Sequence, residues 1–244
     1  MRLGRDVVGV HVGVKICVSV GDKYVNIYFE FQRNENSIPQ AMLNFGKAEE
    51  GQRINSDVKV IIIGDVAVGK SKLVERYLTG DYDPRRLTTP LSLYRKAVAI
   101  GKDNDKSTVT VDFWDTAGGE KFNSLHAAYY YRADVCILVF DVTRKGTYLS
   151  LEQLYKDLRK HRPTLPCIVV ANKVDVDYNV TRKNFEFPRE HNLPFFFASA
   201  ADGMNVIKIF EEAVCAGLGQ RKYGENEFLT ECLALYDSNP RQKR

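Results

Sequence analysis

Apolar and polar segments alternate along the chain from Asp57 to about Gln220. Short apolar runs separated by amphipathic segments of helical length are typical of a sheet with helices on both faces. The pattern predicts strands over Val58–Ile63, Ser92–Ile100, Thr108–Phe113, Val135–Phe140, Cys167–Ala171 and Phe195–Ala198. It predicts helices over Lys70–Leu78, Lys121–Tyr131, Tyr148–Lys160, Asn205–Leu218 and, broken by Pro188, Arg182–His191.

The connections decide how these strands pair. The polar turn Gly101–Ser107 is too short for a helix, so the second and third strands are expected to form an antiparallel hairpin. The other connections are long enough for helical crossovers, which join parallel strands. We therefore expect an α/β domain over residues 54–220, with a six-stranded, mostly parallel sheet, one antiparallel edge strand and helices on both faces.

Residues 1–53 form an N-terminal extension whose role the sequence leaves unknown. The alternating residues Val10, Val12 and Val14 and the run Tyr24–Phe31 suggest two or three strands, whereas the polar run Gln32–Pro39 offers little for a core. The extension is either a small appended β element or a poorly ordered segment, and its composition favours the second.

The C-terminal tail, residues 221–244, contains apolar residues at helical spacing. They are Phe228, Leu229, Cys232, Leu233 and Tyr236. This spacing predicts a short amphipathic helix, which either packs on the domain or docks a partner.

Composition and charge narrow the class of protein. The formal net charge of +4 comes from basic and acidic residues mixed along the chain, so no nucleic acid or anionic lipid is expected as a main partner. Cys136 and Cys167 lie inside apolar runs, which fits a reducing compartment. No apolar run reaches the length of a membrane span, and Cys232 lies too far from the C-terminus for a prenylation box. We expect a cytoplasmic monomer with no evident lipid anchor.

A phosphate-binding loop directly follows the first predicted strand of the domain. Its sequence is GDVAVGKS, made of Gly64, Asp65, Val66, Ala67, Val68, Gly69, Lys70 and Ser71, and Lys72 continues it into the predicted helix. The two glycines let successive N–H groups point at one anion, Lys70 places a charge on the outer phosphates, and the Ser71 hydroxyl can hold Mg²⁺. The motif predicts a nucleoside triphosphate as ligand.

A second motif, Asn172-Lys173-Val174-Asp175, lies at the carboxyl end of a predicted strand, where ligands bind in open α/β sheets. Asn172 can bond the base edge, and the Asp175 carboxylate can accept from two N–H groups of guanine. Adenine offers no such pair and would leave the carboxylate unsatisfied. The residues Ser199, Ala200 and Ala201, after the last strand, can offer N–H groups to the guanine oxygen. The predicted base is guanine.

A third motif, Trp114–Glu120 (WDTAGGE), follows the strand Thr108–Phe113. Asp115 is expected to hold Mg²⁺ directly or through water, and the N–H of Gly118 can sense the γ-phosphate. The loops that carry the three motifs and Ser199 are expected to converge on one nucleotide.

Together these motifs resemble those of the Ras-like small GTPases, and DFWDTAGGEKF resembles their Rab branch. The segments HAAYYYRADVCILVFDVTRKGTY, RPTLPCIVVANKVD and SAADGMNVIKIF are similar to the Rab-like protein 2 group, over roughly residues 57–236. That resemblance implies a GTP-dependent switch that binds GTP or GDP with Mg²⁺. It also implies effectors in the intraflagellar transport complex and a basal-body protein, at the base of a cilium or flagellum.

The resemblance also assigns roles to residues that no motif identifies. Thr89 falls where the Mg²⁺-contacting threonine of the first switch is expected, and Tyr82 where an aromatic ring lies against the guanine. Lys70, Thr89 and position 119 form the expected catalytic set.

Two positions depart from the family. Gly119 replaces the glutamine that usually orients the attacking water, and Val66 crowds the phosphate loop where glycine or serine is usual. Slow hydrolysis is expected, unless Glu120 or a partner's side chain positions the water. The alternatives are a GTP-loaded scaffold that hardly turns over, which Val66 and Gly119 favour, and a P-loop kinase, against which the Asn172–Asp175 motif argues.

Overall fold

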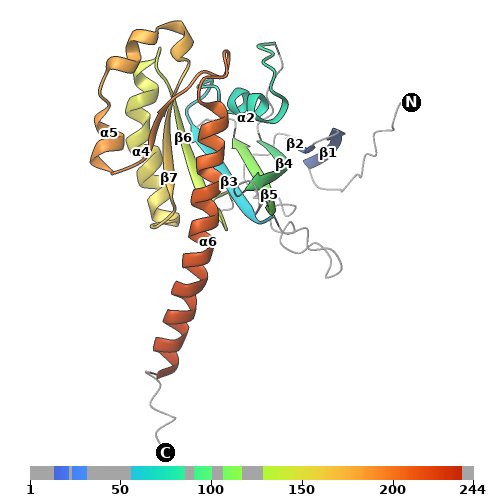
Figure 1. The fold of residues 1–244 in the computed structure, drawn as a ribbon, viewed down its shortest axis with the longest axis vertical. Helices are drawn as coiled ribbons and strands as arrows, with labels where there is room; N and C mark the ends of the chain where they lie inside the picture. The colour runs from blue at the N-terminus through green and yellow to red at the C-terminus, as the bar shows by residue number, and fades with distance from the viewer. Residues whose placement is uncertain are drawn as a thin grey trace, which may run out of the picture.

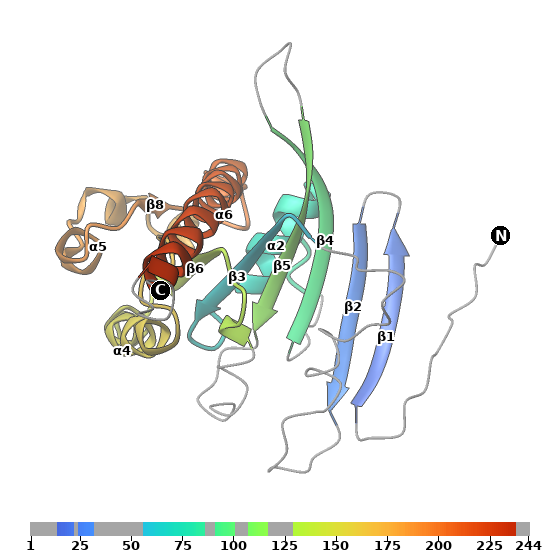
Figure 2. The same cartoon turned by 90° about the horizontal axis from the view of Figure 1, so that it is seen from below.

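In the computed structural model, the residues described are 14–21, 24–31, 56–85, 91–100, 107–116 and 129–237. Figure 1 shows an α/β domain from which one long helix extends, and Figure 2 shows the strands of its sheet side by side. The labels of the elements are those of Figure 1.

Six strands form the predicted sheet. They are β3 (Val58–Gly64), β4 (Leu91–Ile100), β5 (Ser107–Thr116), β6 (Val135–Asp141), β7 (Cys167–Asn172) and β8 (Phe195–Phe197). Their order is β4-β5-β3-β6-β7-β8. Strands β4 and β5 pair antiparallel from Leu91↔Thr116 to Ile100↔Ser107, and each of the other pairs is parallel. The predicted fold class is confirmed, with strand bounds within a few residues of those expected.

Two strands from the N-terminal extension lengthen this sheet. Strands β1 (Val14–Gly21) and β2 (Tyr24–Phe31) form an antiparallel hairpin, and β2 pairs antiparallel with β4 from Val25↔Arg95 to Tyr28↔Ser92. The complete sheet therefore has eight strands. Strand β4 was expected to be an edge strand, but it lies between β2 and β5. The structure thus describes an appended β element in residues 1–53, the less favoured alternative. The physical reason is that the outer side of β4 offers unpaired backbone groups on which a further strand can pair.

Helices cover both faces of the sheet. They are α2 (Lys70–Thr79), α4 (Lys145–His161), α5 (Glu186–Glu190) and α6 (Val206–Asp237), with two short 3₁₀ helices, η2 (Val174–Val176) and η3 (Tyr178–Arg182). The side chains of β3 alternate between the faces: Val60 and Ile62 pack with α2 and α6, whereas Ile61 and Ile63 pack with α4 and α5. Because both faces of β3 are covered, all of its residues are buried.

The helices differ from the prediction in three places. The segment Arg182–His191 divides into the end of η3 and the short α5, in which Pro188 occupies the first turn, where a missing N–H is tolerated. Helix α6 continues without a break past residue 220, so the predicted tail helix is its C-terminal half. Of Lys121–Tyr131, only the last three residues are described, and Tyr129 and Tyr130 are helical.

No helix in the described ranges combines the length and the apolar character needed to cross a membrane.

Candidate functional site

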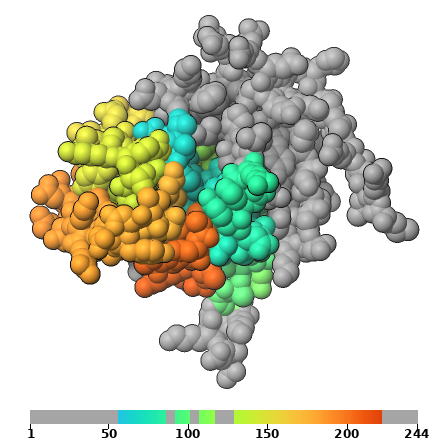
Figure 3. All heavy atoms as spheres, turned by 90° about the horizontal axis from the view of Figure 1, so that it is seen from above, coloured from blue at the N-terminus to red at the C-terminus, as the bar shows by residue number. Residues whose placement is uncertain are grey.

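The phosphate loop joins β3 to α2 and has a backbone that only glycine allows at two positions. A Cβ on Gly64 would lie 2.2 Å from the carbonyl oxygen of Val139 on the neighbouring strand β6. Gly69 has φ +98°, and a Cβ there would lie 2.3 Å from Nδ2 of Asn172. The loop is therefore packed tightly against the ends of β6 and β7, and the two glycines of the motif are required by close approach and by a left-handed backbone. Figure 3 shows this segment from above, where it reaches the surface beside α2.

Lys70 begins α2 and points back along the loop. Its ammonium donates to the carbonyl oxygens of Gly64 at 2.9 Å and Asp65 at 2.8 Å, and its side chain is buried. Burial lowers the pKa of Lys70 to about 8, and Asp115 and Asp65 act against that shift. Both hydrogen bonds of the ammonium go to neutral carbonyls, and its pKa stays lowered despite the two carboxylates, so an anionic phosphate beside it is electrostatically favoured.

Asp115 and Ser71 fit a bound Mg²⁺. Asp115 is 1% exposed, and neither of its carboxylate oxygens has a hydrogen-bond partner among the described residues. Burial raises the pKa of Asp115 to about 7, against the influence of the nearby Ser71 hydroxyl and Lys70 ammonium. An orphaned buried carboxylate beside a hydroxyl provides the oxygen ligands that Mg²⁺ prefers, in the small number that suits an ion shared with phosphates. The described residues contain no cluster of three His, Cys, Asp or Glu side chains that could hold a metal by themselves.

Asn172 makes two contacts that the motif did not predict. Its side chain is buried, Nδ2 donates to the carbonyl oxygen of Val68 at 2.8 Å, and Oδ1 accepts from the N–H of Ala200 at 3.2 Å. Both ends of the amide therefore join protein segments, the phosphate loop and the loop after β8. Asn172 is therefore a brace between two loops, and because its amide keeps a second N–H and a second lone pair, its contact with the base edge stays a prediction.

Asp175 is exposed, so it is accessible to a ligand, and its role in base recognition stays a prediction. Its Oδ1 accepts a hydrogen bond from Oγ of Ser199 at 2.7 Å, which fixes the carboxylate without consuming both oxygens. Two of the three N–H groups expected to reach guanine are already used, since Ser199 donates to Met204 and Ala200 donates to Asn172. The N–H of Ala201 has no partner among the described residues, so it is the donor that remains for the base.

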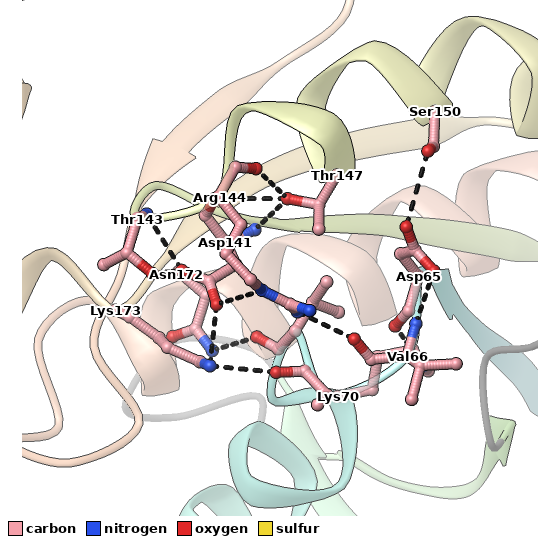
Figure 4. Close-up of polar contacts among 12 residues, drawn as sticks. Asp65, Val66, Lys70, Asp141, Thr143, Arg144, Thr147, Ser150, Asn172 and Lys173 are labelled. Atoms are coloured by element: carbon pink, nitrogen blue, oxygen red, sulfur yellow. Dashed lines mark hydrogen bonds and ion pairs between the residues drawn. The ribbon is translucent and has the colours of Figure 1, made fainter.

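An ion-pair network that the sequence motifs did not reveal supports the phosphate loop from outside. Asp141, at the end of β6, is 1% exposed, and its Oδ2 contacts Nζ of Lys173 at 2.7 Å and Nε of Arg144 at 3.0 Å. Lys173 also donates to the carbonyl oxygen of Ala67, and Arg144 to that of Val66 (Figure 4). The sequence signal that could have revealed this network is an acidic residue, Asp141, at the end of a buried strand with an arginine three residues later.

The remaining predicted site residues divide into two groups. Tyr82 lies after α2, is 39% exposed and makes no hydrogen bond or ring contact among the described residues. Lys72 forms an ion pair with Glu75 at 3.0 Å. Thr89, Gly118 and Gly119 lie outside the described residues.

Comparisons with known proteins agree with this geometry. Residues 59–217 match the Ras family. The chain is 48% identical to Rab-like protein 2A of Pongo abelii over 73% of its own length and 76% of the relative's. It is 46% identical to the Rab-like protein 2A of Mus musculus over 76% and 81% of the two chains, and 49% identical to Rab-like protein 2B of Homo sapiens over 72% and 75%.

Ras-family domains bind guanine nucleotides and Mg²⁺, and the buried Lys70, the orphaned Asp115 and the accessible Asp175 provide a site of that kind. The chain therefore belongs to the Ras family of small GTPases, as a Rab-like member.

Proposed function

We propose that this small GTPase is a slowly hydrolysing switch that, in its GTP form, recruits components of the intraflagellar transport complex and a basal-body protein. Membership in the Ras family supports the part of the proposal that the chain is a GTP-dependent switch. The ciliary role is proposed because the segments similar to the Rab-like protein 2 group extend across the whole domain, where a partner would bind. The proposed place of action is the cytoplasm at the base of a cilium or flagellum.

The observation that carries slow hydrolysis is the position of Val66. Its backbone lies in the phosphate loop, held at the carbonyl by Arg144, and the residue is 49% exposed. A branched side chain at this position crowds the space into which an activator's arginine would reach. Gly119 adds to this, because a glycine has no side chain with which to orient the attacking water.

Nucleotide-dependent binding to purified intraflagellar transport complex tests the proposal. The chain loaded with a non-hydrolysable GTP analogue should bind, and the GDP-loaded chain should bind at least about tenfold more weakly, as in other population-shift switches. Ser71→Asn provides a control, because it removes the hydroxyl expected on Mg²⁺ and disfavours the GTP form. Equal binding of the GTP, GDP and Ser71→Asn forms would contradict the proposed function.

A second candidate, a GTP-loaded scaffold that does not cycle, is favoured by the same Val66 and Gly119. It differs in the nucleotide that the protein carries. Protein purified rapidly from its host should contain mostly GDP if it cycles, even slowly, and mostly GTP if it is a scaffold.

A further inference from the structure

Three consecutive carbonyl groups of the phosphate loop accept hydrogen bonds from side chains on its outer side. Arg144 Nη2 donates to the oxygen of Val66 at 2.7 Å. Lys173 Nζ donates to the oxygen of Ala67 at 2.9 Å, and Asn172 Nδ2 to that of Val68 at 2.8 Å. Lys173 and Asn172 belong to the guanine motif, but Arg144 belongs to no motif and comes from the connection between β6 and α4.

The geometry of the peptide group gives these contacts a consequence for the opposite side of the loop. No peptide bond in the described residues is cis, and in a trans peptide the C=O and the following N–H point in opposite directions. Holding the Val66 oxygen outward therefore directs the N–H of Ala67 inward, where the loop surrounds its anion. A cation on the carbonyl also polarises the peptide and makes that N–H a stronger donor.

The guanidinium is held in this position by a buried carboxylate. Asp141 contacts Arg144 and Lys173 through the same oxygen, Oδ2, while Oδ1 accepts from the N–H and the hydroxyl of Thr143 at 2.9 and 2.6 Å. Although burial by itself would raise the pKa of Asp141, the hydrogen bonds from Lys173, Thr143 and Arg144 hold it below its ordinary value. A single ionised carboxylate thus orients two cations onto adjacent carbonyls of the loop (Figure 4).

Local helix chemistry does not explain an arginine at this position. Arg144 is the N-cap residue of α4, and its side chain makes no capping hydrogen bond. Serine, threonine, aspartate and asparagine are preferred at N-caps, and a cation there faces the positive end of the helix dipole. The positive charge of Arg144 is unfavourable at the N-terminus of α4, whereas its side chain contacts the phosphate loop and the buried Asp141. We therefore attribute the arginine at this position to its contact with the phosphate loop.

We infer that Arg144 is a positioning residue for nucleotide binding: held by Asp141, it fixes the Val66–Ala67 peptide so that its N–H faces the β-phosphate side of the loop. This inference deepens the proposed function, since it rests on the same nucleotide site. It does not depend on hydrolysis or on any effector.

The test compares the dissociation of fluorescent GDP from the full chain and from Arg144→Gln. This substitution keeps much of the aliphatic part of the side chain but removes the positive charge and the paired N–H donors of the guanidinium. Loss of a charge-assisted hydrogen bond should speed GDP dissociation about tenfold. Arg144→Ala should release GDP at least as fast. Lys145→Ala is the matched control, because it removes the same charge from the next residue, which is exposed and has no hydrogen bond or ion pair among the described residues. It should leave the rate unchanged.

Competition with GMP separates positioning from a general loss of structure. GMP lacks the β-phosphate, so the affinity of Arg144→Gln for GMP should fall less than twofold while its affinity for GDP falls about tenfold. An unchanged GDP dissociation rate in both Arg144 variants overturns the inference, and so does an equal loss for GMP and GDP. Failure of the proposed function is detected separately, in the binding of the parent chain to the transport complex.

Discussion

Asp115 is a buried acid whose ionisation is expected to be coupled to the binding of Mg²⁺. Its pKa is raised from 3.8 to about 7 by burial, so below about pH 7 a proton competes with Mg²⁺ for the carboxylate. In the metal-free protein the folded state binds this proton more tightly than the unfolded state does. The contribution of Asp115 to stability is therefore present at low pH and is lost as the pH rises from 3.8 through about 7.

We predict that the Mg²⁺ affinity of the GDP-bound chain rises by up to about tenfold per pH unit below pH 7 and then levels off. Magnesium titrations followed by the release of fluorescent GDP, between about pH 5.5 and 8.5, measure this slope. The phosphates of GDP titrate in the same range, so Asp115→Asn provides the baseline to subtract. A parent and an Asp115→Asn curve of equal slope would exclude Asp115 as the titrating ligand.

Asp175 is predicted to select the base. In Asp175→Asn the amide presents a donor to the guanine N–H groups, so GTP affinity should fall by about 10²-fold while xanthosine triphosphate, which carries an oxygen there, binds better. Competition binding with GTP and xanthosine triphosphate measures this change of base preference. Asp177→Asn serves as control: Asp177 is exposed, and Asn can still accept the hydrogen bond from Asn179 that begins η3. An unchanged preference for GTP in Asp175→Asn would show that another group reads the base.

The sequence was informative about residues whose role depends on their neighbours in the chain. Lys70 and Ser71 could be assigned from the motif because strand, loop and helix follow each other directly. The bracing contacts of Asn172 were not predicted, since its hydrogen-bond partners, Val68 and Ala200, are distant in sequence and become neighbours only at the edge of the sheet. Arg144 was missed for the same reason, because its contacts are with the phosphate loop and with Asp141.

At the scale of elements, periodicity predicted which segments are strands and helices but not where α6 ends or what pairs with β4. No strong helix breaker follows residue 220: the next proline is Pro240, and a single glycine, Gly224, is tolerated in a helix. The pairing of β2 with β4 depends on a free sheet edge, which exists only after the domain has folded.

Two of the three glycines in helix α6, Gly217 and Gly219, should respond oppositely to the same substitution. A Cβ on Gly217 would lie 2.6 Å from Cγ1 of the buried Val58, whereas a Cβ on Gly219 would meet nothing within 4 Å. Gly219→Ala should therefore raise the free energy of unfolding by about 0.5–1 kcal/mol through helix propensity. Gly217→Ala should lower it by about 1–3 kcal/mol, because α6 must move away from β3. Chemical denaturation of the GDP-bound variants measures both free energies of unfolding. Changes of the same sign in the two variants would show that α6 does not pack as described.

At the scale of the whole molecule, the proposed switch depends on a nucleotide site whose phosphate loop is held in place by several side chains. Carbonyls of the phosphate loop are held by Arg144, Lys173 and Asn172, and the buried Lys70 and Asp115 provide fixed charges next to it. Such a site supports tight nucleotide binding, and none of these five residues is one that orients the attacking water. Binding and turnover are therefore separable in this chain, and turnover is the property that Val66 and Gly119 are expected to limit.

We predict that intrinsic hydrolysis by the parent chain is at or below about 10⁻⁴ s⁻¹, the scale of an unassisted small GTPase. Gly119→Gln combined with Val66→Gly should raise it, and by more than the product of the single changes, because a water-orienting amide is useful only when the space beside the γ-phosphate is open. Single-turnover assays of the four proteins in Mg²⁺ measure the coupling. Equal GDP affinity of all four would locate the effect in the chemical step. A parent that hydrolyses GTP as fast as the double variant must place its water by another group, and Glu120→Ala would then be expected to abolish that activity.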